Sequence, residues 1–386
     1  MPTDQGDPTN RFEAATPGGV PIDVARYPLP DYPGRLWSQW GQGVVLPDGR
    51  YISAVGDHCG IDGDSFVFEV DAAASTVRRV GGVARLLDHR PGEWGYGKIH
   101  AAAISLGDDD VYLATYWGSR RGIRYTDNYR GDALVRYDTS AGTLTKVAVP
   151  VPGHGIPSLA GWPAGGLLYG EAVDGTAGNK RGAFFVFDTR SGTTIFRSDE
   201  PRHTGFRSIL VDAEGRAYFS AGEGRLWRYD PDDDRLALHD ASIPGAHLRA
   251  ATAPAPDGTV YGVTDDPPML FRMRPGGGIE TIGPARGYTA SIALDAAGRR
   301  LFYVPDAHGK AWEEGTPLIA VDVDSGAETV VAKLNDLVGK RLGLVLGGSY
   351  NVAFDARAKR VYVGLNAGTT TAETFGEVVL AAVTPP

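Results

Sequence analysis

The chain has 386 residues, of which 42% are hydrophobic and 22% are charged, so it contains enough apolar side chains for a large core. Its formal net charge of −9 argues against a nucleic-acid partner, because phosphate groups are bound by basic surfaces. A single cysteine, Cys59, excludes an internal disulfide framework.

The N-terminal stretch 1–18 has no basic segment followed by an apolar one, and we expect it to be irregular. The absence of a signal-peptide pattern predicts a cytoplasmic protein, although a secreted protein whose leader had been removed would read the same way. No run of 18 apolar residues occurs, so we expect no membrane span. We also expect a monomer.

From residue 42 onward, one unit of four short strands recurs along the chain. Each unit has an apolar strand, a turn resembling Asp-Gly, a strand with an aromatic residue, a strand that often ends in Asp, and a fourth strand. The units begin at Gln42, His100, Pro157, Arg207, Arg249, Ala290 and Tyr350. Their spacing of about 40 to 60 residues is typical of four-stranded propeller blades.

The seventh unit has no fourth strand after 378–383, whereas an apolar stretch at 21–27 precedes the first unit. We therefore expect 21–27 to complete the last blade and to remove an open sheet edge. The sequence predicts an all-β protein, a single seven-bladed β-propeller over 1–386 closed by an N-terminal strand. A β-sandwich would not explain the sevenfold recurrence. Residues 332–342 fit a short helix in a long loop.

The residue that opens each first strand has a special position, because these strands converge on the central channel. The channel mouth would therefore carry two arginines, a histidine, a tyrosine and a glutamine, at the positions where the units begin. Seven of the eight histidines, all but His239, fall in segments that border this mouth. Either the polar groups satisfy one another in a water-filled channel, or they form a site that recognises an anion.

Several residues follow as candidates for chemistry. The planar arginine side chains suit a carboxylate or pair with acidic neighbours, and Cys59 is either a nucleophile or a small packing residue. We expect His100, Arg207, Arg249 and Tyr350 to share one cavity, with His58 at its rim. The candidate catalytic residues are His100, His58, Tyr350 and Arg207. The candidate substrate-binding residues are Arg249, Lys98, Gln42, Tyr116, Trp117, Tyr288, His154 and His203.

No motif for a metal or a cofactor is present. The chain lacks His-x-His, His-Glu-x-x-His, Cys-x-x-Cys and a phosphate-binding loop, so the sequence requires no cofactor. The acidic segments at 62–64 and 108–110 have the composition of calcium ligands, but without the rest of a calcium loop they indicate ordinary turns. A structural calcium in the channel stays an open alternative.

The chain resembles the propeller polysaccharide lyases, namely the ulvan and rhamnose–glucuronate lyases and the related propeller rhamnosidases. The resemblance lies in the seven blades, the His/Arg/Tyr set at the channel mouth and the chain length. The resemblance implies a carbon–oxygen lyase that cleaves a uronate-containing oligosaccharide by β-elimination. Arg207 or Arg249 would then bind the carboxylate, and His100, His58 and Tyr350 would share proton transfer. The alternatives are a non-catalytic propeller that binds a small acid or a protein, or a glycoside hydrolase or lactonase on the same scaffold.

Overall fold

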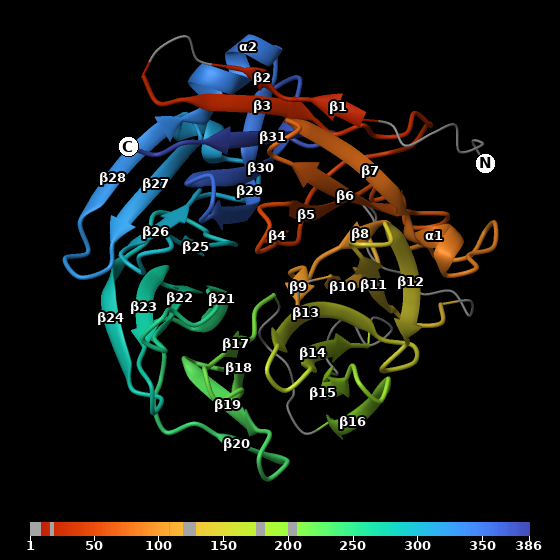
Figure 1. Cartoon of the computed structure of the whole chain (residues 1–386), viewed down its shortest axis with the longest axis vertical. Helices are drawn as coiled ribbons and strands as arrows, with labels where there is room; N and C mark the ends of the chain where they lie inside the picture. The colour runs from red at the N-terminus through yellow and green to blue at the C-terminus, as the bar shows by residue number, and fades with distance from the viewer. Residues whose placement is uncertain (1–8, 16–18, 108, 119–128, 175–181, 200–206) are drawn as a thin grey trace.

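The computed structural model describes residues 9–15, 19–107, 109–118, 129–174, 182–199 and 207–386. Seven antiparallel sheets stand around a common centre in the order of the chain, as Figure 1 shows. The predicted seven-bladed β-propeller is therefore confirmed. Within the described part of the chain, no helix is long and apolar enough to span a membrane.

The blades are numbered along the chain, and their strands are given from the channel outward. Blade 1 has β4 (Val44–Val45), β5 (Tyr51–Gly56), β6 (Ser65–Asp71) and β7 (Thr76–Gly82). Blade 2 has β8 (Lys98–Ile99) and β9 (Ile104–Ser105), then β10 (Asp110–Tyr116), β11 (Leu134–Asp138) and β12 (Thr143–Ala148). Blade 3 has β13 (Gly155–Trp162), β14 (Leu167–Val173), β15 (Gly182–Asp188) and β16 (Thr193–Ser198).

The same arrangement continues around the ring. Blade 4 has β17 (Leu210–Val211), β18 (Ala217–Gly222), β19 (Arg225–Asp230) and β20 (Arg235–Leu238). Blade 5 has β21 (His247–Ala251), β22 (Val260–Asp265), β23 (Met269–Met273) and β24 (Ile279–Pro284). Blade 6 has β25 (Ala293–Leu294), β26 (Arg300–Tyr303), β27 (Pro317–Asp322) and β28 (Glu328–Lys333).

Blade 7 joins the two ends of the chain and closes the ring. Its strands are β29 (Val345–Asp355), β30 (Arg360–Gly368), β31 (Glu377–Val383), β3 (Ile22–Arg26) and β2 (Glu13–Ala14). The β3–β31 register pairs Ile22 with Val383 and Arg26 with Val379, so the predicted closure by an N-terminal strand is confirmed.

Part of the stretch that we expected to be irregular forms strands instead. The strand β1 (Thr9–Arg11) pairs with β7 on blade 1, and β2 pairs with β3 on blade 7. The physical reason is that β7 and β3 would otherwise be outer strands with unpaired backbone groups, which the N-terminal segment covers.

Helices are few and short among the described residues. The helix expected over 332–342 begins later, because β28 runs to Lys333; it consists of a π-helical turn, η2 (Asn335–Gly339), and α2 (Lys340–Leu342). Two helical turns were not expected from the sequence, α1 (Val83–Leu86) and η1 (Ala311–Glu314).

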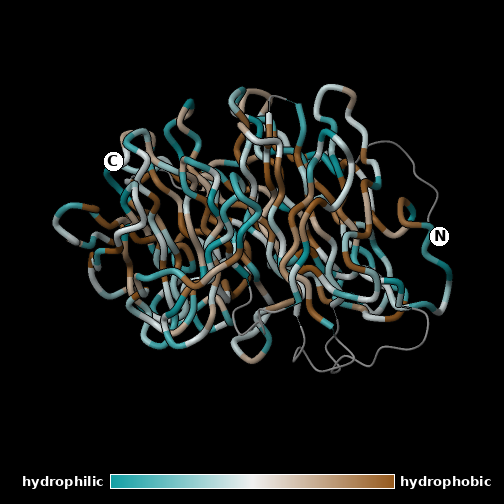
Figure 2. The backbone as a smooth tube through the Cα atoms, turned by 90° about the horizontal axis from the view of Figure 1, so that it is seen from below, coloured by the Kyte–Doolittle hydropathy of each residue, from teal (hydrophilic) through white to brown (hydrophobic). Residues whose placement is uncertain are grey.

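The core lies between neighbouring blades, where aromatic side chains of adjacent sheets stack. Phe184 of blade 3 and Phe219 of blade 4 lie in parallel with ring centroids 4.6 Å apart, and both are completely buried. Each such side chain contributes about 1.5–3 kcal/mol by leaving water. Figure 2 shows the resulting pattern, with hydrophobic strand segments through the disc and hydrophilic loops toward its faces.

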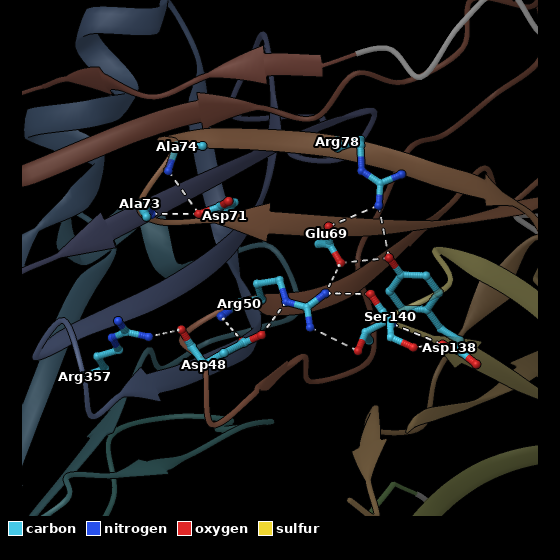
Figure 3. A network of polar contacts seen from close by, with 12 residues as sticks. Asp48, Arg50, Glu69, Asp71, Ala73, Ala74, Arg78, Asp138, Ser140 and Arg357 are labelled. Carbon is cyan, nitrogen blue, oxygen red and sulfur yellow. Dashed lines mark hydrogen bonds and ion pairs between the residues drawn. The ribbon is translucent and has the colours of Figure 1, made fainter. Parts of the chain in front are cut away.

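A polar network joins blade 1 to both of its neighbours, as Figure 3 shows. The half-buried Glu69 forms ion pairs with Arg50 and Arg78, each at 3.1 Å. It also accepts a hydrogen bond from the hydroxyl of Tyr137 in blade 2 at 2.8 Å. On the other side, Arg357 of blade 7 donates to the backbone carbonyl of Asp48 at 2.8 Å. These contacts fix three blades relative to one another away from the channel mouth.

Candidate functional site

Arg207 lies three residues before β17, the inner strand of blade 4, and its side chain reaches across the channel. One terminal nitrogen, Nη1, donates to the carbonyl oxygen of Trp40 at 2.6 Å, and the other, Nη2, lies 2.7 Å from Nε2 of His100 in blade 2. The residue is 8% exposed, so its guanidinium is largely removed from water. Arg207 therefore links blades 2 and 4 across the channel.

The backbone at Arg207 is held in an uncommon conformation. Its φ of +121° is unusual for a residue with a side chain. The amide of Arg207 donates to Oγ of Ser158 in blade 3 at 2.8 Å, and that hydroxyl donates to the buried Glu171 at 2.5 Å. Backbone strain that surrounding contacts maintain is common where a side chain must be aimed at a functional site.

His100 has both ring nitrogens occupied. Its Nδ1 lies 2.7 Å from the carbonyl oxygen of Pro157, which can only accept, so Nδ1 carries the proton. Its Nε2 then accepts from the Arg207 guanidinium, which can only donate. Burial, followed by the positive charges of Arg207 and Lys98, lowers the pKa of His100 well below its usual range. The ring is thus a neutral support for Arg207, and the geometry gives it no free nitrogen for the proton transfer that the sequence suggested.

Tyr350 packs directly against Arg207 from blade 7. The centre of the guanidinium lies 4.4 Å from the centroid of the Tyr350 ring, and the phenol oxygen lies 2.6 Å from Nδ1 of His308. Tyr350 is completely buried, whereas His308 is exposed at the mouth. Partial burial, and then the charges of Arg207, Arg249 and Lys98, lower the pKa of His308 to about 4, so its ring is neutral near pH 7. The two residues form a hydrogen-bonded pair suited to moving a proton.

Arg249 of blade 5 differs from Arg207 in having a carboxylate partner. Its Nε lies 3.2 Å from Asp265, its Nη2 donates to the hydroxyl of Tyr288, and its guanidinium lies 4.7 Å from the Tyr288 ring centroid. The Tyr288 ring in turn lies 4.2 Å from that of His308. Arg249 is therefore part of the same mouth, with its charge already partly balanced.

Lys98 of blade 2 lies among aromatic rings. Its Nζ is 3.7 Å from the Trp40 ring centroid and 5.7 Å from that of Tyr116. Burial, and then the neighbouring Arg207, lower the pKa of Lys98 well below its usual range. Among the residues that the structure describes, neither Lys98 nor Arg207 forms an ion pair with a carboxylate.

An aromatic layer surrounds these basic groups. The Trp40 ring stacks on Phe375 at 5.6 Å with an interplanar angle of 5°, and on His58 at 5.2 Å. All three side chains are half-buried, so each keeps some surface toward solvent. The mouth thus combines flat apolar surfaces with positive charge, which suits an organic anion.

A cavity of about 360 Å³ occupies the channel. His100, Arg207 and Arg249 line it at the mouth, and most of its remaining wall is built from small apolar residues such as Ala102 and Ala250. Three of the four residues that we expected to share one cavity therefore do so. Tyr350 is not part of this wall and contacts the guanidinium of Arg207 instead.

Of the remaining predicted substrate-binding residues, Gln42 also lines the cavity. The side-chain amide of Gln42 donates to the carbonyls of Ile292 and Val352 at 3.1 and 2.9 Å, which ties blade 1 to blades 6 and 7. Tyr116 and Trp117 are buried and stack on each other at 4.0 Å. Nδ1 of His154 lies 2.9 Å from the carbonyl oxygen of Pro152 in its own loop. His203 lies outside the described residues.

The sequence comparison between repeats missed several residues of the mouth. Trp40, Asp265, His308 and Phe375 lie in loops or at strand ends, outside the ring position that the repeat alignment singled out. The comparison of the repeated units did place His308 in a loop that borders the mouth, and this position was the one sequence feature that could have identified it. Trp40 precedes the first unit by two residues, so nothing in the repeat pattern pointed to it.

No metal centre is evident in the described part of the chain, which has no group of three or more His, Cys, Asp or Glu side chains placed to hold an ion. Cys59 contacts the loop around it, with Sγ 3.3 Å from the carbonyl oxygen of Gly34. Burial, and then the nearby Asp57, raise the pKa of the Cys59 thiol to about 12, which disfavours the thiolate that a nucleophile needs.

The fold and the mouth define a seven-bladed β-propeller with a basic, aromatic-rich site at one end of its channel. Known structures of this architecture are similar over nearly the whole chain. A catalytically inactive virginiamycin B lyase from Staphylococcus aureus, solved with quinupristin, has a TM-score of 0.59 at 10% identity over 94% of this chain and 99% of that chain. A streptogramin B lyase has a TM-score of 0.57 at 11% identity, covering 94% and 98% of the two chains.

The WD40 repeats of RRP9 are similar to the same degree, with a TM-score of 0.57 at 10% identity over 97% of this chain and all of that chain. No protein-family model and no curated protein matches the sequence. The similarities therefore establish the propeller fold, with lyases among its structural neighbours.

Proposed function

We propose that this protein is a carbon–oxygen lyase that cleaves a uronate-containing oligosaccharide by β-elimination at the channel mouth. The observation that carries the proposal is the placement of Arg207 and Lys98. Arg207 packs on Tyr350 of the Tyr350–His308 pair, and Lys98 lies over Trp40, whose ring centroid is 4.6 Å from that of Tyr350. Neither basic residue has a carboxylate partner among the described residues. A buried basic group without a counter-charge is costly, and a bound substrate anion would remove that cost.

The carboxylate of the substrate would bind to Arg207 and Lys98. In a uronate, this group is attached to the carbon whose proton is removed, so its charge grows as the proton leaves. A guanidinium held in place by Trp40 and His100 stabilises that growing charge without having to reorganise. Binding of an anion also favours the protonated form of Lys98, because it offsets the nearby charge of Arg207.

The Tyr350–His308 pair would take the substrate proton. When Nδ1 of His308 donates to the phenol oxygen, Nε2 carries a lone pair and acts as the base. The bound carboxylate offsets the charges of Arg207, Arg249 and Lys98, which raises the pKa of His308 from about 4 toward the range useful for a base. The electrons of the broken C–H bond form the new double bond, and the adjacent C–O bond breaks.

The aromatic layer supports a sugar as the substrate class. The rings of Trp40 and Phe375 are parallel and half-buried, and Lys98 lies over the Trp40 ring. The apolar face of a pyranose ring can pack on such a surface while its carboxylate reaches the basic groups.

The test is to incubate the protein with oligosaccharides that contain glucuronate and to follow the ultraviolet absorbance of the unsaturated uronate product. We expect product from the wild type and a loss of at least about a hundredfold in kcat/KM for Arg207→Gln. Arg216→Gln is the matched control and should keep full activity, because Arg216 lies in the turn between β17 and β18 and pairs with Asp212. Cleavage without an unsaturated product would favour a hydrolase and contradict the proposal.

A second candidate function is a non-catalytic propeller that binds a small acid at the same mouth. The observation that favours it is burial: Tyr350 is completely buried and both nitrogens of His100 are engaged. Calorimetric binding of glucuronate that depends on Arg207, with no product from any uronate oligosaccharide, would support this second function.

A further inference from the structure

His247 and Arg249 share one carboxylate on blade 5. His247 begins β21, Asp265 ends β22, and the two are directly opposite each other in the sheet. Nδ1 of His247 lies 3.1 Å from Oδ1 of Asp265, while Oδ2 lies 3.2 Å from Nε of Arg249. The carboxylate therefore bridges the imidazole and the guanidinium and fixes both on the same side of the sheet.

This contact determines how the His247 ring is oriented. A carboxylate accepts hydrogen bonds, so the proton on Nδ1 points to Asp265 and Nε2 is left as the nitrogen that gains or loses a proton. When the ring carries both protons, the proton on Nε2 is the one that it can donate. The side chains of His247 and Asp265 are 30% and 25% exposed, so the pair is held in place and still reaches solvent.

His100 and His308 of the same mouth are bound differently. Both nitrogens of His100 are engaged, and Nδ1 of His308 faces a phenol. Of these three, His247 alone has a carboxylate as its Nδ1 partner. It belongs to the same mouth, since Arg249 packs on Tyr288 and Tyr288 packs on His308.

We propose that His247, oriented by Asp265, is the second proton-transfer residue and gives its Nε2 proton to the departing oxygen. This assignment rests on the proposed elimination. The base takes the proton from carbon, the C–H electrons form the double bond, and the C–O bond breaks with its electrons on oxygen. The proton on Nε2 of the imidazolium then goes to that oxygen, and solvent returns a proton to His247.

The test uses two substrates that differ in the departing group. One is a glucuronate oligosaccharide, whose sugar oxygen needs a proton to leave; the other carries 4-nitrophenoxide at the same position, which leaves without one. His247→Gln should lower kcat on the oligosaccharide by at least about a hundredfold. The same variant should stay within about threefold of wild type on the nitrophenoxide substrate, because proton donation is then not required.

Asp265→Asn serves as the second variant, because it keeps the shape of the side chain while removing the carboxylate that orients the His247 ring. We expect a selective loss on the oligosaccharide in the same direction and of smaller size. His239→Gln is the matched control, since His239 lies on the outer strand side of blade 4 and its Nε2 lies 2.9 Å from the carbonyl oxygen of Gly277. This control should leave both rates unchanged.

Two results would overturn the assignment. Equal losses on both substrates in His247→Gln would indicate a structural role, and no loss on either would show that the residue takes no part. Both differ from failure of the proposed function, in which the wild type itself produces no unsaturated uronate from either substrate.

Discussion

Nε2 of His100 lies 2.7 Å from Nη2 of Arg207, and this contact across the channel determines the role of each residue. The histidine accepts from the guanidinium and simultaneously donates to the carbonyl of Pro157. Its ring therefore aims Arg207 at the mouth. His100 is a positioning residue, and the group that it positions is the one best placed to meet an anion.

The first prediction tests this positioning role. His100→Ala should weaken glucuronate binding by about tenfold, which corresponds to about 1.4 kcal/mol, because Arg207 loses its acceptor. His100→Gln should recover most of the affinity, since its side-chain amide has both an acceptor and a donor. Calorimetric titration measures both. A pH profile of kcat that changes shape in His100→Gln would instead indicate proton transfer by His100.

The second prediction concerns the shape of the Arg207 side chain. Arg207→Lys keeps the positive charge but loses the planar fork that contacts Trp40 and His100. We expect at least about a tenfold increase in the Kd for glucuronate and a similar fall in kcat/KM. Equal affinities of wild type and variant, measured at the same salt concentration, would show that charge alone is needed.

The third prediction follows from the lowered pKa of Lys98. The empty site disfavours the ammonium, and a bound carboxylate favours it, so binding should take up protons. Affinity should consequently fall as the pH rises above the pKa of Lys98 in the empty site. Calorimetry in buffers with different ionisation enthalpies measures the uptake, and Lys98→Met should reduce it. Proton release on binding would contradict this explanation.

The fourth prediction concerns stability away from the mouth. Glu69→Gln removes the charge that Arg50 and Arg78 share, and it should lower the free energy of unfolding by about 1–3 kcal/mol. Glu214→Gln is the control, because Glu214 is 55% exposed in its ion pair with Arg216 and should change stability by less than about 0.5 kcal/mol. Chemical denaturation measures both, and equal effects would show that the network does not stabilise the blade contacts.

The fifth prediction concerns ring closure. Removing residues 1–27 leaves β31 without its β3 partner and should lower the thermal midpoint sharply. A synthetic peptide covering 19–29 should restore part of that loss when added in excess, because binding to the folded state stabilises it. A truncated chain as stable as the full chain would mean that β3 is dispensable for closure.

The fold could be predicted because each blade repeats the same strand pattern and turn chemistry. A blade cannot bury its apolar faces alone, so seven copies imply a closed ring, and the leftover strand at 21–27 fits only the incomplete last blade. The N-terminal pairing of Thr9–Arg11 was not predictable in this way, since its polar sequence resembles a loop and becomes a strand only beside β7.

The candidate site was likewise predictable only in part. The sequence by itself determined which residues open the inner strands, and so it placed His100, Arg207, Arg249 and Tyr350 at one mouth. Only the tertiary structure decided their roles, because hydrogen bonds between different blades leave no trace in local sequence. Across the channel, Pro157 and Arg207 occupy both nitrogens of His100, while Asp265 orients His247 and Tyr350 meets His308. These partners come together because the ring closes, and their spacing along the chain does not predict which of them will be in contact.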